Sequence, residues 1–183
     1  MYDTPVLIMN CRIGALGIMR SLGRLGVELH GVDEDRHAPA FASRYCRGRY
    51  IKAFDETRSE EYLEFVVRIG KRFGRKAILI PTSDELSVFV AEYGDALQEH
   101  FLFPRNGRQL VTDLMSKEGM YGLAIKHGVP TPATGFPRSL QDVHAYAAGA
   151  AYPVMLKGIL GNRLESRTGL KMLLVQRQEE LVE

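Results

Sequence analysis

Several features that would place this 183-residue chain in a specialised class of protein are missing from its sequence. No apolar run approaches the roughly 18–20 residues that a membrane-spanning helix needs. The first residues, Met1–Pro5, carry no basic segment ahead of an apolar one, so a secretory signal is not expected. Two cysteines, Cys11 and Cys46, are too few for a disulfide framework. We therefore expect a protein of the reducing cytoplasm that has no membrane partner.

An excess of charge of one sign is also lacking. The 24 Lys and Arg residues nearly balance the 22 Asp and Glu residues, which gives a formal net charge of +2, and both signs are mixed throughout. A dedicated nucleic-acid-binding protein would carry a basic stripe, so nucleic acid is not expected as a partner. None of the five histidines pairs with another His or a Cys at metal-ligand spacing, so no metal site is predicted within this chain.

What the sequence does contain is an alternation of short apolar runs and helical stripes over its first hundred or so residues. Pro5–Met9 and Val27–Val32 are typical of buried parallel strands, and helical spacing separates them. Tyr50–Phe54 and Ala77–Ile80 predict two further strands on either side of an amphipathic helix over Tyr62–Phe73. This pattern predicts an α/β fold, a Rossmann-like parallel sheet with helices on both faces.

Two polar loops directly follow predicted strands of this sheet, Asn10–Gly17 and Thr82–Glu85. Open parallel sheets bind ligands at the carboxyl ends of their strands, so we expect both loops at one edge of the sheet. A strand-to-helix turn also presents free backbone N–H groups to an anion. The residues predicted to bind substrate are Asn10, Arg12, Gly14, Gly17, Ser83, Asp84 and Glu85.

Each loop also has a purely structural interpretation. Gly14 and Gly17 would then only permit a tight turn, and Thr82–Glu85 has the spacing of a helix capping box.

Asp33, about twenty residues after Gly14, resembles the ribose-binding acid of a dinucleotide site. The glycine pattern is G-x-x-G, however, and not the G-x-G-x-x-G of that site. A nucleotide-dependent oxidoreductase is therefore the weaker interpretation.

The pattern changes near Thr112, where we place a boundary between a domain over residues 1–112 and a second over 113–183. The second domain has no strand–helix–strand repeat. Its last residues, 178–183, begin a helix too short to be stable alone, so we expect this domain to be incomplete. Its predicted helices and strands are Ser116–His127, Ser139–Ala148, Pro153–Leu156 and Lys171–Val175.

Two lysines stand at ends of these elements. Lys117 begins the first helix, and Lys157 ends an apolar strand just before a loop that contains Gly158, Gly161 and Gly169. Such lysines suit a polyphosphate, because an ammonium group is a mobile point charge and glycines let backbone N–H groups come close. Each lysine taken alone would be an ordinary exposed residue, and it is the combination that favours a nucleotide site.

In their order and spacing these segments resemble the ATP-grasp superfamily. The segment from Met115 to Pro132 is similar to its first ATP-contacting lysine and the turn that follows, and Tyr152–Gly158 is similar to its second ATP lysine, ahead of a phosphate-covering loop. Arg20–Gly23 and Ala42–Tyr45 resemble the branch that contains carbamoyl-phosphate-synthase-like proteins and amino-acid ligases. The first 112 residues resemble the domain that precedes the ATP-grasp fold. The ATP-binding residues that the resemblance implies are Lys117, Lys157, Gly158 and Gly161.

The resemblance implies part of a ligase that uses ATP and Mg²⁺ to join a small-molecule carboxylate to an amine, or to a thiol, through an acyl phosphate. The loop after Lys157 is poorer in glycine and richer in arginine than in biotin carboxylase relatives. The family's adenine-hinge and magnesium-binding residues would lie beyond Glu183, so the chain alone is expected to be inactive. It would then act as a homodimer or together with a C-terminal ATP-grasp portion, and no catalytic residue is named within it.

A function of another class stays open at this point. The chain could be a non-catalytic Rossmann-type module that binds a small molecule or a nucleotide. Lys117 and Lys157 favour the ligase, because neither this module nor an oxidoreductase needs them.

Overall fold

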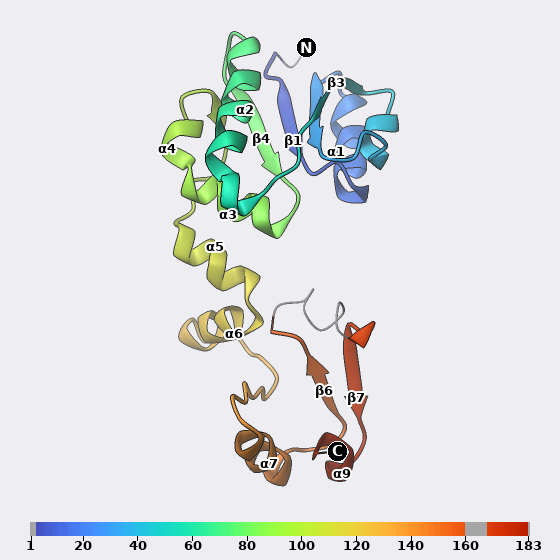
Figure 1. Cartoon of the computed structure of the whole chain (residues 1–183), viewed down its shortest axis with the longest axis vertical. Coiled ribbons are helices and arrows are strands. Elements are labelled where there is room, and N and C mark those ends of the chain that lie inside the picture. Colours follow the sequence, from blue (N-terminus) through green and yellow to red (C-terminus); the bar gives the residue numbers. More distant parts are fainter. Residues whose placement is uncertain (1–2, 160–167, 183) are drawn as a thin grey trace. The chain divides into compact units, whose positions relative to one another are not determined.

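A computed structural model describes residues 3–159 and 168–182 of the chain. It separates into two units, Met1–Val111 and Thr112–Glu183. Figure 1 colours the first unit from blue to light green and the second from yellow to red. The first unit contains the polar loops Asn10–Gly17 and Thr82–Glu85, and the second contains Lys117 and Lys157.

The first unit is built on a parallel sheet with the strand order β3-β2-β1-β4-β5. Its chain starts at the central strand, adds strands on one side, and then crosses to the other side. The topological switch point, where a parallel sheet opens a crevice for ligands, therefore lies between β1 and β4. The strands are β1 (Val6–Met9), β2 (Leu29–Asp33), β3 (Cys46–Ile51), β4 (Ala77–Pro81) and β5 (Phe101–Leu102).

Helices cover both faces of this sheet, as Figure 1 shows, so the predicted α/β fold is confirmed. One face carries α1 and the short turn η1, and the other carries α2 and α3. The bounds are α1 (Ile13–Gly23), η1 (Pro39–Ala42), η2 (Glu56–Arg58), α2 (Ser59–Arg72), α3 (Asp84–Glu92) and α4 (Gly94–Leu97).

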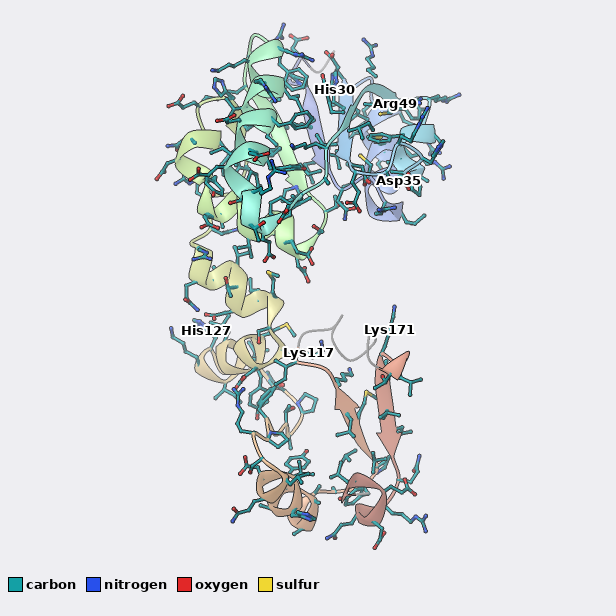
Figure 2. The ribbon with its side chains drawn as sticks, viewed as in Figure 1. His30, Asp35, Arg49, Lys117, His127 and Lys171 are labelled. Atoms are coloured by element: carbon teal, nitrogen blue, oxygen red, sulfur yellow. The ribbon has the colours of Figure 1, made fainter. Side chains whose placement is uncertain are left out.

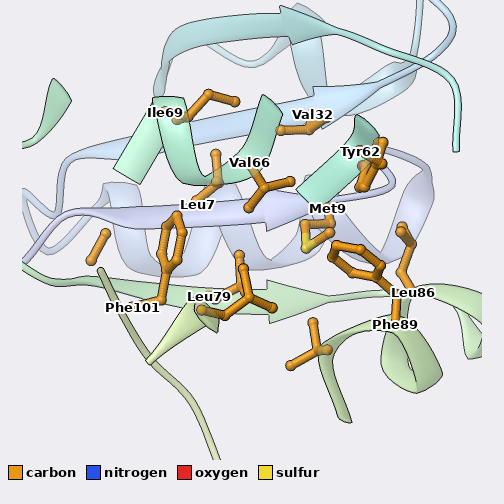
Figure 3. Close-up of a cluster of buried hydrophobic side chains, with 13 residues drawn as sticks. Leu7, Met9, Val32, Tyr62, Val66, Ile69, Leu79, Leu86, Phe89 and Phe101 are labelled. Carbon is orange, nitrogen blue, oxygen red and sulfur yellow. The ribbon is translucent and has the colours of Figure 1, made fainter. Parts of the chain in front are cut away.

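Alternate residues of β1 supply the two hydrophobic cores. Leu7 and Met9 pack with Val66 and Phe89 on the α2 and α3 face (Figure 3). Val6 and Ile8 belong to the opposite core, with α1 and η1. This alternation is the two-residue period of a strand, and burying each large aliphatic side chain contributes about 1.5–3 kcal/mol. The rigidity of β1 between two cores gives a fixed base to the loop that follows it.

The strand β3 begins at Cys46, four residues before the predicted start at Tyr50. It lies at the edge of the sheet, and its side chains alternate between half-buried and exposed. Arg47 and Arg49 occupy the exposed positions, so the segment has no continuous apolar run. The prediction was wrong here because it looked for the apolar pattern of a central strand.

The second unit contains helices and two strands, as predicted, and the two strands pair antiparallel. Helix α5 runs across the expected boundary at Thr112, which the sequence pattern did not indicate. Ser139 and Asp142 form the predicted capping box at the start of α7. The elements are α5 (Arg108–Met115), α6 (Lys117–Lys126), α7 (Leu140–Gly149), β6 (Val154–Lys157), β7 (Met172–Val175) and α9 (Gln178–Val182). Within the described ranges, no helix has the length and apolar character needed to cross a membrane.

Candidate functional site

The two polar loops meet at the carboxyl edge of the sheet, as predicted. They follow β1 and β4, which are adjacent and parallel, with Met9 in register with Pro81. The N–H of Thr82 donates to the carbonyl of Met9 at 3.1 Å. The Thr82 hydroxyl lies 3.0 Å from the Met9 carbonyl and 2.5 Å from the Asn10 carbonyl, and it can donate to either. These contacts hold the two loops together at the switch point.

The turn after β1 is made by Asn10 and not by a glycine. Its φ of 67° lies in the left-handed region, which asparagine adopts more readily than most residues. Gly14 and Gly17 fall inside α1, where a Cβ added to either would meet no atom within 4 Å. The expectation that these glycines serve the tight turn is therefore wrong.

In the second loop, Ser83 caps the start of helix α3. Its Oγ accepts a hydrogen bond from the N–H of Leu86 at 3.4 Å, which satisfies one free donor at the start of α3. The Thr82 hydroxyl is directed instead to the carbonyls after β1. The capping box expected from Thr82 to Glu85 is thus not formed, and the Glu85 side chain is not used as a helix cap.

Asp33, the last residue of β2, organises the first loop from inside. Only 2% of its side chain is exposed. Its two carboxylate oxygens accept hydrogen bonds from the N–H of Cys11 at 2.6 Å and from the N–H of Asp35 at 2.9 Å. The guanidinium of Arg12 lies 3.7 Å away and compensates the buried charge. Each oxygen therefore already holds one backbone N–H of this loop, and Asp33 also lines the pocket at this edge of the sheet.

Cys11 is packed in the core beneath the loop. It is fully buried, and its Sγ lies 3.5 Å from the carbonyl of Val32 as a hydrogen-bond donor. Burial, together with the nearby charge of Asp33, raises the pKa of the Cys11 thiol to about 12. A neutral buried thiol is a poor nucleophile, so Cys11 serves the packing of the core.

A pocket of about 230 Å³ opens at this edge of the sheet. Four of the seven predicted substrate residues line it together: Asn10, Arg12, Ser83 and Glu85. The other three, Gly14, Gly17 and Asp84, are exposed residues near the starts of α1 and α3 and are not part of the pocket wall.

Other residues of the pocket wall were not predicted. Lys52 directly follows the end of β3 at Ile51, whereas the predicted strand Tyr50–Phe54 ends three residues too late and so includes this lysine. Tyr62 had been assigned to the apolar stripe of α2, which it does occupy, but it also lines the pocket. The signal for Lys52 is the same as for the two loops, since it too follows the carboxyl end of a parallel strand.

The pocket wall carries charges of both signs. Arg12 is shared among three carboxylates, with nitrogen–oxygen distances of 3.7, 3.7 and 3.4 Å to Asp33, Glu34 and Asp35. Lys52 lies 3.8 Å from Glu61, which itself is also paired with Arg58. In the part of the chain that the structure describes, Glu85 has no ion-pair partner. Burial raises the pKa of Tyr62, so its hydroxyl stays protonated.

In the second unit, α6 begins beside the end of β6. Ser116 caps the helix by accepting from the N–H of Gly119 at 3.4 Å, and the N–H of Lys117 donates to the carbonyl of Ile159 at 3.4 Å. Figure 2 labels Lys117 at the start of α6. Ile159 is two residues past Lys157, so this bond ties the backbones of the two lysine-bearing segments together.

Lys157 is exposed and Lys117 is half-buried. Over residues 3–159 and 168–182, neither lysine has a carboxylate within ion-pair distance. Gly158 immediately follows β6, as expected. Gly161 and most of the predicted phosphate-covering loop lie outside the described residues, which omit 160–167.

Known proteins resemble this chain in sequence and in fold. A formate-dependent phosphoribosylglycinamide formyltransferase of Corynebacterium glutamicum (strain R) is 28% identical over 171 residues, which are 92% of this chain and 39% of that protein. The ADP complex of purK, an N5-carboxyaminoimidazole ribonucleotide synthetase, aligns with a TM-score of 0.71 at 13% identity over 97% of this chain and 42% of its own. The L-amino acid ligase from Bacillus licheniformis aligns with a TM-score of 0.68 at 15% identity over 100% of this chain and 41% of its own. The chain is a homologue of the ATP-grasp ligases. No family model matches it.

The homology covers the N-terminal part of ATP-grasp ligases, and the chain spans about 39% of the length of the curated relative. The predicted superfamily and the predicted α/β fold are therefore both confirmed. In the described part of the chain, no group of three or more His, Cys, Asp or Glu side chains could hold a metal ion.

Proposed function

We propose that this chain supplies the acceptor-substrate pocket and the first ATP-contacting residues of an ATP-dependent ligase. The reaction would join a carboxylate to an amine, or to a thiol, through an acyl phosphate. The observation that carries the proposal is the meeting of the Asn10 and Ser83 loops around a polar pocket at the switch point between β1 and β4. This is where open parallel sheets bind their ligands.

The pocket suits a small molecule that carries both an amine and an anionic group. Glu85 can accept hydrogen bonds from an amine, since it has no cation partner among the described residues. Lys52, held only loosely at 3.8 Å from Glu61, can turn to an anionic group. Arg12 is already compensated by three carboxylates, so its role is to position the loop more than to supply net charge.

The second unit would hold part of the nucleotide. Lys117 and Lys157 would act as point charges on the phosphates, and the backbone N–H after Lys157, at Gly158, can approach closely because glycine has no side chain. ATP, when bound, supplies the phosphoryl group that activates the carboxylate. Mg²⁺ normally neutralises the charge in such transfers, and we place its ligands in the part of the ligase that this chain does not span.

A binding experiment tests the nucleotide assignment. Titration calorimetry of ADP with the 183-residue chain should give an affinity about tenfold lower for Lys117→Met and for Lys157→Met, because each loses a charge-assisted contact. Lys126→Met is the matched control, an exposed lysine at the opposite end of the same helix as Lys117. Equal affinity for all four proteins would refute the assignment.

A kinetic experiment tests the amine pocket. In the whole ligase, Glu85→Gln should raise KM for the amine substrate while leaving KM for ATP unchanged. Glu64→Gln, an exposed carboxylate on α2 outside the pocket, is the matched control. A change in KM for ATP alone would contradict the pocket assignment. Nucleotide binding with no ADP formed from any acid and amine pair would favour the non-catalytic binding module instead.

The isolated chain gives a further expectation. The 183 residues should bind nucleotide without turning it over, since they span only about 39% of the curated relative. Coupled-enzyme detection of ADP would measure this, and steady ADP release by the isolated chain would contradict the assignment of the metal ligands to the remaining part.

A further inference from the structure

Two stretches of the first unit contain no Asp or Glu at all. The first is residues 4–27, which include α1, and the second is residues 36–54, which include η1 and β3. Both contain arginines, and the fold packs them against each other through the core beneath α1 and η1. Although the whole chain has a formal net charge of only +2, its positive charge is therefore concentrated on one part of the first unit.

A pocket of about 310 Å³ lies where these stretches meet. Arg20 and Arg24 reach it from the end of α1, and Arg44 and Tyr45 from the connection between η1 and β3. Ala42 and Ser43 complete its wall. We call this the arginine pocket. It shares no lining residue with the pocket at the β1–β4 edge.

The arginine pocket is held in shape by packing. A Cβ added at Gly23 would overlap the ring of Tyr45, so the ring is seated directly on the backbone of α1. Ser43 is buried, and its Oγ accepts a hydrogen bond from the N–H of Tyr45 at 3.3 Å. The guanidinium of Arg44 donates to the Tyr45 hydroxyl at 2.7 Å and lies 4.9 Å from the centre of its ring. Two polar head groups are thus fixed at the wall.

The charge of this pocket is not compensated by the protein. Across the described residues, no carboxylate lies within ion-pair distance of Arg20, Arg24 or Arg44. Arg12 provides the contrast, since it contacts three carboxylates. A favourable interaction with the C-terminal end of the α1 dipole explains the presence of Arg20 and Arg24, but it does not explain why Arg44 converges on them.

We propose that the arginine pocket binds the phosphate or diphosphate group of a small molecule. Guanidinium groups form paired hydrogen bonds that match the oxygens of a phosphate, and three of them supply more charge than a single carboxylate could neutralise. The Tyr45 hydroxyl adds a further polar contact. The hydrogen bond from Arg44 also lowers the pKa of the Tyr45 hydroxyl. This site is additional to the proposed ligase pocket and does not depend on it.

The test uses the unmodified 183-residue chain and inorganic pyrophosphate as the probe, with NaCl added to hold ionic strength constant. In ¹⁵N–¹H correlation spectra, saturable shifts should appear at the amides of Gly23, Ser43 and Tyr45. Shifts confined to Asn10, Cys11 and Arg12, or no saturable shift at all, would overturn the proposal. Inorganic phosphate should compete for the same amides.

Substitutions give the second measurement. Arg20→Gln, Arg24→Gln and Arg44→Gln should each weaken pyrophosphate binding by about tenfold or more, since each loses a charge-assisted contact. Arg47→Gln is the matched control, because it removes the same charge from an exposed position on the adjoining strand β3 and does not line the pocket. If Arg47→Gln weakened pyrophosphate binding equally, the overall positive charge alone would attract pyrophosphate, and the proposed site would be refuted.

Discussion

The buried carboxylate of Asp33 should carry much of the stability of the loop after β1. It accepts from the N–H of Cys11 at 2.6 Å and from the N–H of Asp35 at 2.9 Å. In Asp33→Ala the Cys11 N–H loses its acceptor inside a fully buried residue, whereas the half-buried Asp35 N–H can be hydrated. Hydrogen bonds to a charged group contribute about 1.5–3 kcal/mol each. A buried N–H left without an acceptor also costs the free energy of removing it from water. We expect the first unit to lose about 2–4 kcal/mol of unfolding free energy.

Two further variants separate the hydrogen bonds from the charge. Asp33→Asn keeps one acceptor oxygen for one N–H but presents an NH₂ group to the other, so we expect about half the loss, roughly 1–2 kcal/mol. Glu34→Ala removes a carboxylate that is 61% exposed and only 3.7 Å from the same arginine, Arg12. An exposed pair of this kind contributes about 0–1 kcal/mol, which makes Glu34→Ala the control.

Native-state hydrogen exchange of the β1 amides is the appropriate assay. The chain has two units, so its global unfolding need not be a single transition, while the β1 amides report on the first unit alone. A loss of 2–4 kcal/mol corresponds to exchange about 30- to 700-fold faster, at 1.4 kcal/mol for each factor of ten. If Asp33→Ala and Glu34→Ala accelerate exchange equally, the buried hydrogen bonds are not what holds the loop.

Three other outcomes follow from single contacts. Gly23→Ala should destabilise the first unit by about 1–3 kcal/mol, because the added Cβ would overlap the Tyr45 ring. Gly17→Ala lies in the same helix with open space around it and should stabilise the first unit by up to about 1 kcal/mol. Urea denaturation measures both effects. Burial raises the pKa of Cys11 from 9.0 to about 12, so its thiol should resist alkylation at pH 9 in the folded chain and react in urea, which mass spectrometry can measure. The contribution of this thiol to stability should be complete below pH 9 and fall as the pH rises towards about 12. Ser139→Ala should remove the capping box of α7 at a cost of about 1 kcal/mol, seen as faster amide exchange in that helix.

Each of these has a result that would contradict it. Equal effects of the two glycine substitutions would mean that the Tyr45 ring moves aside without cost. Rapid alkylation of Cys11 at pH 9 would mean that the loop above it opens freely. Unchanged exchange in α7 after Ser139→Ala would mean that the packing of the helix, and not its cap, decides its stability.

Much of the first unit could be predicted from local pattern. Pro5–Met9 is a short apolar run because β1 is buried on both faces. Ala77–Ile80 is also a short apolar run, and β4 occupies it, although only Ala77 and Leu79 are fully buried there. Parallel strands place their carboxyl ends at one edge, so the placement of the Asn10 and Ser83 loops at one edge could be predicted, whereas their direct contact depends on the pairing of β1 with β4. The capping box at Ser139 could likewise be read from residues three apart, since its contacts are local.

The remaining features depended on which distant segments pack together. Tyr62 lies in an apolar stripe whose position over the pocket is set by the docking of α2 on the sheet. The edge strand β3 places Arg47 and Arg49 at its exposed positions, so its first half has no apolar run to mark it as a strand, and only its pairing with β2 identifies it. Arg20 and Arg44, more than twenty residues apart, converge only because η1 packs against α1. Local sequence specifies helices, strands and caps because their interactions span a few residues, whereas pockets arise from contacts between segments that only the folded core brings together.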